Sequence, residues 1–135
     1  MSMNTVVLLL GSNLKDKNKN LLKAKYLIES RVGEVVAMSE IIETEPEDYI
    51  SVHHFLNQTL KVETMLSPIE TLNMIKEIET EMGRLYLVDS QRYQDRLIDI
   101  DILNFNALRF ECKILTVPHP QNFTRNFIKL LRKYF

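Results

Sequence analysis

The sequence is poor in the residues that cross-link small secreted domains or bind structural metals. Its 135 residues include one cysteine, Cys112, so no intramolecular disulfide can form, and the chain fits a reducing compartment. No CxxC element is possible, and a structural zinc site is therefore not expected. Tryptophan is absent and glycine occurs only three times. No GxxxxGK[ST] phosphate-binding loop is present.

Long apolar runs and an excess of one charge sign are also missing. The run Val6–Leu10 near the N-terminus has no basic stretch before it. It is too short for a signal sequence or a membrane span. Seventeen basic and 18 acidic side chains give a net charge of -1, which argues against general binding of nucleic acid or anionic membranes. We expect one cytoplasmic domain over residues 1–135, without nucleic-acid or membrane partners.

The hydrophobic pattern predicts alternating strands and helices. Gly11-Ser12-Asn13 is predicted as a turn after the first strand, and Ser67-Pro68-Ile69-Glu70 as the capping box of the second helix. The order predicts an α+β fold, a ferredoxin-like antiparallel sheet with helices packed on it. Strands are expected at 6–10, 34–44, 55–64 and 97–105, helices at 16–32 and 68–82, a hairpin return within 107–117, and a last helix at 127–135.

Two aspartates alternate with isoleucines in the segment RLIDIDI at 96–102. Side chains alternate along a strand, so Asp99 and Asp101 are predicted on one face, with Cα atoms about 6.5–7 Å apart. Carboxylates this close repel unless a cation or a proton offsets their charge. Mg²⁺ binds one or two such carboxylates and completes its shell with water and phosphate oxygens. The pair predicts a magnesium–nucleotide site or, alternatively, a charged strand that resists aggregation.

Basic residues near this strand favour a ligand that carries phosphate. Arg84, Arg92 and Arg96 precede the aspartates. Guanidinium groups bind phosphate in bidentate geometry, although a surface network of Asp and Arg would also account for them. His119 lies between two prolines, in a rigid turn that could aim it at a phosphate. Taken alone, it is more often a surface residue of the turn.

Three residues are candidates for contact with a flat ligand. Phe55 and Phe127, taken singly, are most economically core residues. Asn57 is predicted on the same strand face as Phe55, and burying its amide is costly unless the amide is hydrogen-bonded. The polar edge of a heterocycle or the backbone could supply that bond.

Taken together, several segments resemble the 6-hydroxymethyl-7,8-dihydropterin pyrophosphokinase family of folate biosynthesis. They occur in the family's order and at nearly its spacing, over almost the whole chain. The most specific part is the strand with two aspartates followed by L-T-V-P-H-P. The matching segments are LLLGSNL at 8–14, IIETEP at 41–46, FLNQTLKVET at 55–64, IETEMGR at 78–84, RLIDIDIL at 96–103 and LTVPHPQNFTRNFI at 115–128.

The resemblance implies a Mg²⁺-dependent enzyme that transfers pyrophosphate from ATP to the hydroxymethyl group of the pterin, leaving AMP. It implies two Mg²⁺ ions on Asp99 and Asp101. It places the pterin between Phe55 and Phe127, with Asn57 and Thr44 at the polar edge of the ring. The implied ATP-binding residues are Glu79, Arg84, Arg96, Ile102, His119 and Arg125, and the implied catalytic residues are Arg84, Arg92 and Arg96.

The sequence departs from the family pattern on the nucleotide side. Tyr86 stands where the second arginine of R-x-R is usual, and Tyr93-Gln94-Asp95 replaces Trp-Gly-Pro before Arg96. These departures bear on turnover rate more than on ligand identity. The main hypothesis is an active pyrophosphokinase. The alternatives are a degenerate paralogue that binds pterin or nucleotide without efficient turnover, and an unrelated ferredoxin-like binding module. The RNA-binding motif typical of such modules is absent.

Overall fold

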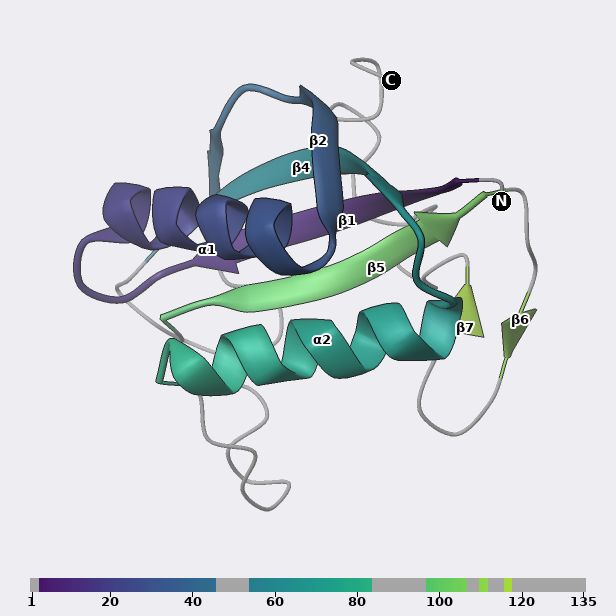
Figure 1. The fold of residues 1–135 in the computed structure, drawn as a ribbon. Coiled ribbons are helices and arrows are strands. Elements are labelled where there is room, and N and C mark those ends of the chain that lie inside the picture. The colour runs from purple at the N-terminus through teal and green to yellow at the C-terminus, as the bar shows by residue number, and fades with distance from the viewer. Residues whose placement is uncertain (1–2, 46–53, 84–96, 107–109, 112–115, 118–135) are drawn as a thin grey trace.

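A five-stranded antiparallel sheet carries two helices on one of its faces (Figure 1). The computed structural model describes residues 3–45, 54–83, 97–106, 110–111 and 116–117. The strand order is β2-β4-β1-β5, and β3 also pairs with β4, which confirms the predicted α+β class. The elements are β1 (Asn4–Ser12), α1 (Lys17–Arg31), β2 (Gly33–Met38), β3 (Ile42–Thr44), β4 (Phe55–Thr64), α2 (Pro68–Glu81), β5 (Asp99–Phe105), β6 (Phe110–Glu111) and β7 (Thr116–Val117).

Both helices begin at capping residues that satisfy their first free N–H groups. At α1 the Asp16 carboxylate accepts from the Lys19 N–H at 3.2 Å. At α2 the predicted capping box is confirmed. The Ser67 hydroxyl accepts from the Glu70 N–H at 3.2 Å, while the Glu70 carboxylate accepts from the Ser67 N–H at 2.9 Å. These caps fix where each helix starts, and so which of its faces meets the sheet.

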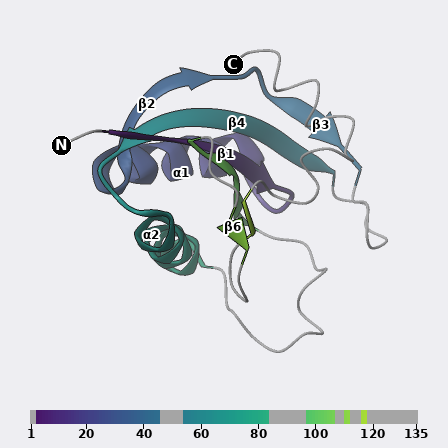
Figure 2. The same cartoon turned by 90° about the vertical axis from the view of Figure 1, so that its right-hand side faces the viewer.

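The main hydrophobic core lies between the sheet and the two helices (Figure 2). Burying one Leu or Ile side chain contributes about 1.5–3 kcal/mol, so this layer dominates the stability of the fold. A smaller cluster, Leu9 with Leu103, lies apart from it and packs against Val7 and Ile42. The main core contains Leu21, Ala24, Leu27 and Ile28 of α1, Ile75 and Ile78 of α2, and Val6, Leu8, Leu10, Leu60, Val62, Ile100, Ile102 and Phe105 of the strands.

Two predicted boundaries are wrong. The expected strand 34–44 is divided into β2 and β3. Ser39 lies in the break, where its N–H donates to the Thr59 carbonyl at 3.0 Å and its hydroxyl accepts from the Thr59 N–H at 2.9 Å. A side-chain oxygen thus replaces a main-chain partner, and the chain can bend. Gly11 and Ser12 were predicted as a turn, but both still belong to β1, because they pair with Asn57 and Leu56 of β4.

The C-terminal part of the described chain contains one antiparallel pair, β6 with β7, which agrees with the predicted hairpin return. Segment 84–96 and the predicted helix 127–135 lie outside the described residues. In the ranges that the structure describes, neither helix has the length and apolar character needed to cross a bilayer.

Candidate active site

The face of the sheet opposite the helices carries the polar side chains predicted for the site. Along β5, Ile100 and Ile102 belong to the main core, whereas Asp99 and Asp101 are half-buried and alternate with them. Along β1, Leu8 and Leu10 pack toward the helices, so Leu9 and Gly11 lie on the opposite face. The predicted alternation of isoleucine and aspartate is therefore confirmed. We call this second face, which neither helix covers, the open face.

One row of residues crosses the open face and joins the two halves of the predicted site. Asp99 of β5 lies opposite Gly11 of β1, and Gly11 lies opposite Asn57 of β4. Residues directly opposite each other on neighbouring strands share a face, and strands lie about 4.8 Å apart. Asp99 and Asn57 are thus on one surface, two strand spacings or about 10 Å apart.

Thr44, Phe55 and Asn57 come together at one end of this row. Asn57 is only 5% exposed, and its amide NH₂ donates to the Thr44 hydroxyl at 2.8 Å and to the Ile42 carbonyl at 3.3 Å. Thr44 pairs with Phe55 across β3 and β4. The donors of the amide are thus satisfied within the protein, which removes the cost of burying them.

Phe55 is not part of the hydrophobic core that the described residues form, which does not favour the interpretation as an ordinary core residue. It is half-buried and lies outside both core clusters of the described residues. Its ring lies beside Gly11: a Cβ atom built on Gly11 would stand 3.4 Å from Phe55 Cδ1 and 3.2 Å from Asn57 Oδ1. The missing side chain at position 11 therefore lets the ring edge and the amide oxygen lie close to the β1 backbone, at a position that is itself buried.

Gly11 is the site residue that sequence reasoning missed. It was treated as part of a generic turn, although a glycine within a strand pattern often marks a close approach by another group. Its position between Asp99 and Asn57 depends on the pairing register of three strands. That register could not be obtained from the glycine's local sequence.

The chemistry of Asp99 and Asp101 fits a magnesium ion that is shared with a phosphate ligand. Both side chains are half-buried oxygen donors on one face of β5. Within the described ranges, no group of three or more acidic, histidine or cysteine side chains is placed to hold a metal. Mg²⁺ commonly binds through one or two carboxylates and takes its remaining ligands from water and phosphates. Two carboxylates on a partly open face match that requirement.

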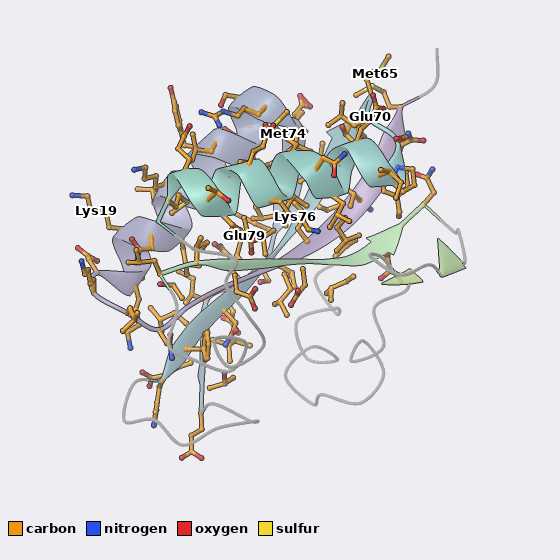
Figure 3. All side chains as sticks on the ribbon, turned by 90° about the horizontal axis from the view of Figure 1, so that it is seen from below. Lys19, Met65, Glu70, Met74, Lys76 and Glu79 are labelled. Atoms are coloured by element: carbon orange, nitrogen blue, oxygen red, sulfur yellow. The ribbon has the colours of Figure 1, made fainter. Side chains whose placement is uncertain are left out.

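Glu79 joins α2 to the strand that carries the aspartates. Its side chain is 3% exposed, and Oε2 accepts from the Ile100 N–H at 2.8 Å (Figure 3). Ile102 is two residues after Ile100 on β5, and its side chain is in the main core. A nucleotide contact from Ile102 would therefore have to come from its main chain.

Comparison with known proteins identifies the family. A family model described as 7,8-dihydro-6-hydroxymethylpterin-pyrophosphokinase (HPPK) matches residues 7–132. The chain belongs to the HPPK family. The chain is 37% identical over 126 residues to the 2-amino-4-hydroxy-6-hydroxymethyldihydropteridine pyrophosphokinase of Porphyromonas gingivalis. The aligned residues cover 93% of this chain and 86% of that protein. It is 36% identical to the protein of the same name from Bacillus subtilis, over 93% of this chain and 74% of that protein.

Solved structures show the same fold. A chain of HPPK-DHPS from Plasmodium falciparum matches with a TM-score of 0.78 at 18% identity, covering 99% of this chain. This chain spans 40% of the length of that solved protein. At this level of identity the likeness shows the fold alone, and it agrees with the antiparallel sheet and two helices described above.

The HPPK residues implied by the resemblance divide into two groups. Those within the described ranges lie on the open face, with two exceptions. Glu79 lies between α2 and β5, and the side chain of Ile102 lies in the main core. The predicted residues that lie outside the described ranges are Arg84, Arg92, Arg96, His119, Arg125 and Phe127.

Proposed function

We propose that this HPPK-family chain, as one domain, transfers pyrophosphate from ATP to the hydroxymethyl group of 6-hydroxymethyl-7,8-dihydropterin, with release of AMP. The observation that carries this proposal is the shared open face. Asp99 and Asp101 lie on the same face of the sheet as Phe55 and Asn57, with Gly11 between them. A phosphate-binding end and a ring-binding end about 10 Å apart can hold two substrates that must react with each other.

The pterin ring is proposed to bind at the end formed by Thr44, Phe55 and Asn57, with Phe127 on its other face. Stacking on an aromatic side chain adds about 0.5–1.5 kcal/mol per contact beyond the area that is buried. The Asn57 amide NH₂ already donates to Thr44 and Ile42. Its carbonyl oxygen, on the Gly11 side, is the atom we expect to accept from the ring.

ATP is proposed to bind at the other end, through Asp99 and Asp101 with two Mg²⁺ ions. Bound Mg²⁺ would neutralise phosphate charge and help to orient the reacting oxygens. Arg84, Arg92 and Arg96 are proposed to stabilise the charge on the transferred group, and Arg84 and Arg96 to bind the phosphates as well. The remaining proposed ATP contacts are Ile102, His119 and Arg125, and Glu79 is proposed to act at this end of the site without a stated contact to ATP.

The proposed reaction requires little covalent chemistry from the protein. The pterin hydroxyl oxygen attacks the β-phosphorus in line, the bond from that phosphorus to the α,β-bridging oxygen breaks, and AMP leaves. The ring-binding residues would hold the hydroxyl at the attacking distance. The carboxylates and arginines would hold the phosphates in a preorganised polar environment, which lowers the barrier by electrostatic stabilisation.

The direct test is to incubate the purified protein with ATP, Mg²⁺ and 6-hydroxymethyl-7,8-dihydropterin and to measure AMP and the pterin diphosphate by chromatography. We expect the two products in equal amounts, and no AMP when either the pterin or Mg²⁺ is omitted. Tight pterin binding without AMP would instead indicate a degenerate paralogue. Binding of neither substrate would overturn the proposal.

A further inference from the structure

Strand β5 forms the outer edge of the sheet order β2-β4-β1-β5, and α2 packs beside this strand. An edge strand leaves every second N–H without a partner in the sheet, and a buried N–H of this kind is costly to leave unbonded. At Ile100 the partner is a side chain: the N–H donates to Oε2 of Glu79 at 2.8 Å. Glu79 thus satisfies the Ile100 N–H from outside the sheet.

The burial of Glu79 shows that packing alone does not explain this residue. Its neighbours on the buried side of α2, Ile75 and Ile78, are aliphatic and belong to the main core. A carboxylate at an equally buried position carries a large desolvation cost unless hydrogen bonds compensate it. An aliphatic residue at position 79 would avoid that cost but would leave the Ile100 N–H unbonded.

Ile100 is the residue between the two candidate metal ligands. Because N–H directions alternate along an antiparallel strand, the outward N–H of Ile100 implies that Asp99 and Asp101 direct theirs toward β1. The pairing of Asp99 with Gly11 and of Asp101 with Leu9 agrees with this. The strand is therefore held from β1 at the two aspartates and from α2 at the residue between them.

We propose that Glu79 is a positioning residue that fixes the spacing of the Asp99 and Asp101 carboxylates through its bond to the Ile100 N–H. This inference rests on the proposed function, in which the two carboxylates bind Mg²⁺ together with ATP. A rotation of the peptide at Ile100 would move both aspartates, because both are joined to this residue. Loss of the Glu79 acceptor should therefore weaken Mg²⁺ binding much more than it weakens pterin binding.

Three substitutions separate positioning from direct contact with the nucleotide. Glu79→Gln keeps an acceptor oxygen at the same reach and removes the charge. Glu79→Asp keeps the charge and withdraws the oxygens by one methylene group. Glu79→Met keeps the side-chain volume and removes both oxygens. Glu77→Met is the matched control, since Glu77 is an exposed carboxylate on the same helix.

Two measurements do not depend on turnover. Exchange of the Ile100 amide hydrogen, followed by NMR, reports the bond itself. Binding of Mn²⁺ in the presence of α,β-methylene ATP, followed by electron paramagnetic resonance, reports the metal site. The third measurement is the Mg²⁺ concentration that gives half-maximal AMP formation at saturating ATP and pterin.

Positioning predicts that Glu79→Met and Glu79→Asp raise the Mn²⁺ dissociation constant and the Mg²⁺ midpoint about 10- to 100-fold, the usual cost of losing a residue that orients a metal ligand. Amide exchange at Ile100 should accelerate at least tenfold in both variants. Pterin affinity should stay within about twofold, and Glu79→Gln should restore most of the metal affinity and the slow exchange. Glu77→Met should change none of these quantities.

Direct charge contact with ATP predicts the opposite order. Glu79→Gln would then be as impaired as Glu79→Met in metal–nucleotide binding, and Glu79→Asp would be the milder change; this result would overturn the proposal. A lower melting temperature with an unchanged Mn²⁺ dissociation constant would also overturn it. If Glu79→Met does not fold, the comparison of Gln with Asp decides. If the wild type forms no AMP, the proposed function fails, while the Mn²⁺ and exchange measurements still test positioning.

Discussion

Replacing Gly11 with alanine should separate ligand binding from stability more cleanly than any other single change on the open face. Gly11 lies between Asp99 and Asn57, and its φ is not in the left-handed region, so alanine fits the backbone. The new Cβ would stand 3.2 Å from Asn57 Oδ1 and 3.4 Å from Phe55 Cδ1. The Asn57 oxygen would have to move by a few tenths of an ångström, whereas the Phe55 contact is close to ordinary van der Waals length.

The expected effect on stability is small because two contributions oppose each other. Alanine in a strand gains about 0.5–1 kcal/mol over glycine, since the unfolded chain loses less conformational freedom. The close contact with Asn57 costs a comparable amount, which leaves the free energy of unfolding within about 1 kcal/mol of the wild type. The methyl group would also lie between the β1 backbone and the Phe55 ring edge and Asn57 oxygen proposed to meet the pterin. Pterin affinity should fall by about 1–2 kcal/mol, or roughly 5- to 30-fold.

The assay combines urea unfolding with fluorescence titration of the pterin at fixed Mg²⁺. Gly33→Ala is the matched control, because a Cβ there would stand 1.9 Å from the Glu63 carbonyl oxygen, in backbone that cannot easily yield. That variant should lose about 1–3 kcal/mol of stability, and its folded fraction should bind pterin normally. Wild-type pterin affinity in folded Gly11→Ala would show that the ring does not approach this row.

Three further changes test other parts of the molecule. Asp101→Ala should abolish AMP formation while a metal-independent titration still detects pterin binding; wild-type turnover would remove the metal site from the proposal. Phe55→Ala should weaken pterin binding with a stability loss well below the 3–5 kcal/mol typical of a core phenylalanine, as thermal melts beside titrations can show. Ser67→Ala should remove the α2 cap and lower the free energy of unfolding by about 1 kcal/mol, with kcat unchanged; a change in kcat at saturating substrates would link this end of α2 to the site.

The elements with strong local signals could be predicted from the sequence. The bounds of β4 and the capping box of α2 agree with the structure, because alternation and capping are properties of consecutive residues. The break at Ser39 could not be predicted because it depends on residues that are far apart in the sequence. Apolar residues continue on both sides of it, and the bond between the Ser39 hydroxyl and Thr59 joins residues 20 positions apart.

The candidate site shows the same division. The alternation of Asp99 and Asp101 with isoleucine follows from local sequence, and so does the shared face of Phe55 and Asn57. Which strands lie side by side does not. Gly11 was linked to the candidate site only through pairing with β4 on one side and β5 on the other. Glu79 was already a predicted site residue, but its bond to Ile100, 21 positions away, could not be predicted from the sequence.

The position of β5 at the sheet edge explains how stability and metal binding can depend on the same strand. Ile100 and Ile102 contribute to the main core, while Asp99 and Asp101 face the other side. A strand in the interior of a sheet pairs with a strand on each side. Because β5 lies at the edge, only β1 pairs with it, and α2 packs along its other side. Glu79 bonds the main chain there and leaves the open face to the ligands. A further strand in place of α2 would also satisfy the Ile100 N–H, but it would extend the sheet and place more residues beside the two carboxylates, which raises the cost of their charge. A helix with one buried carboxylate satisfies the edge without that cost.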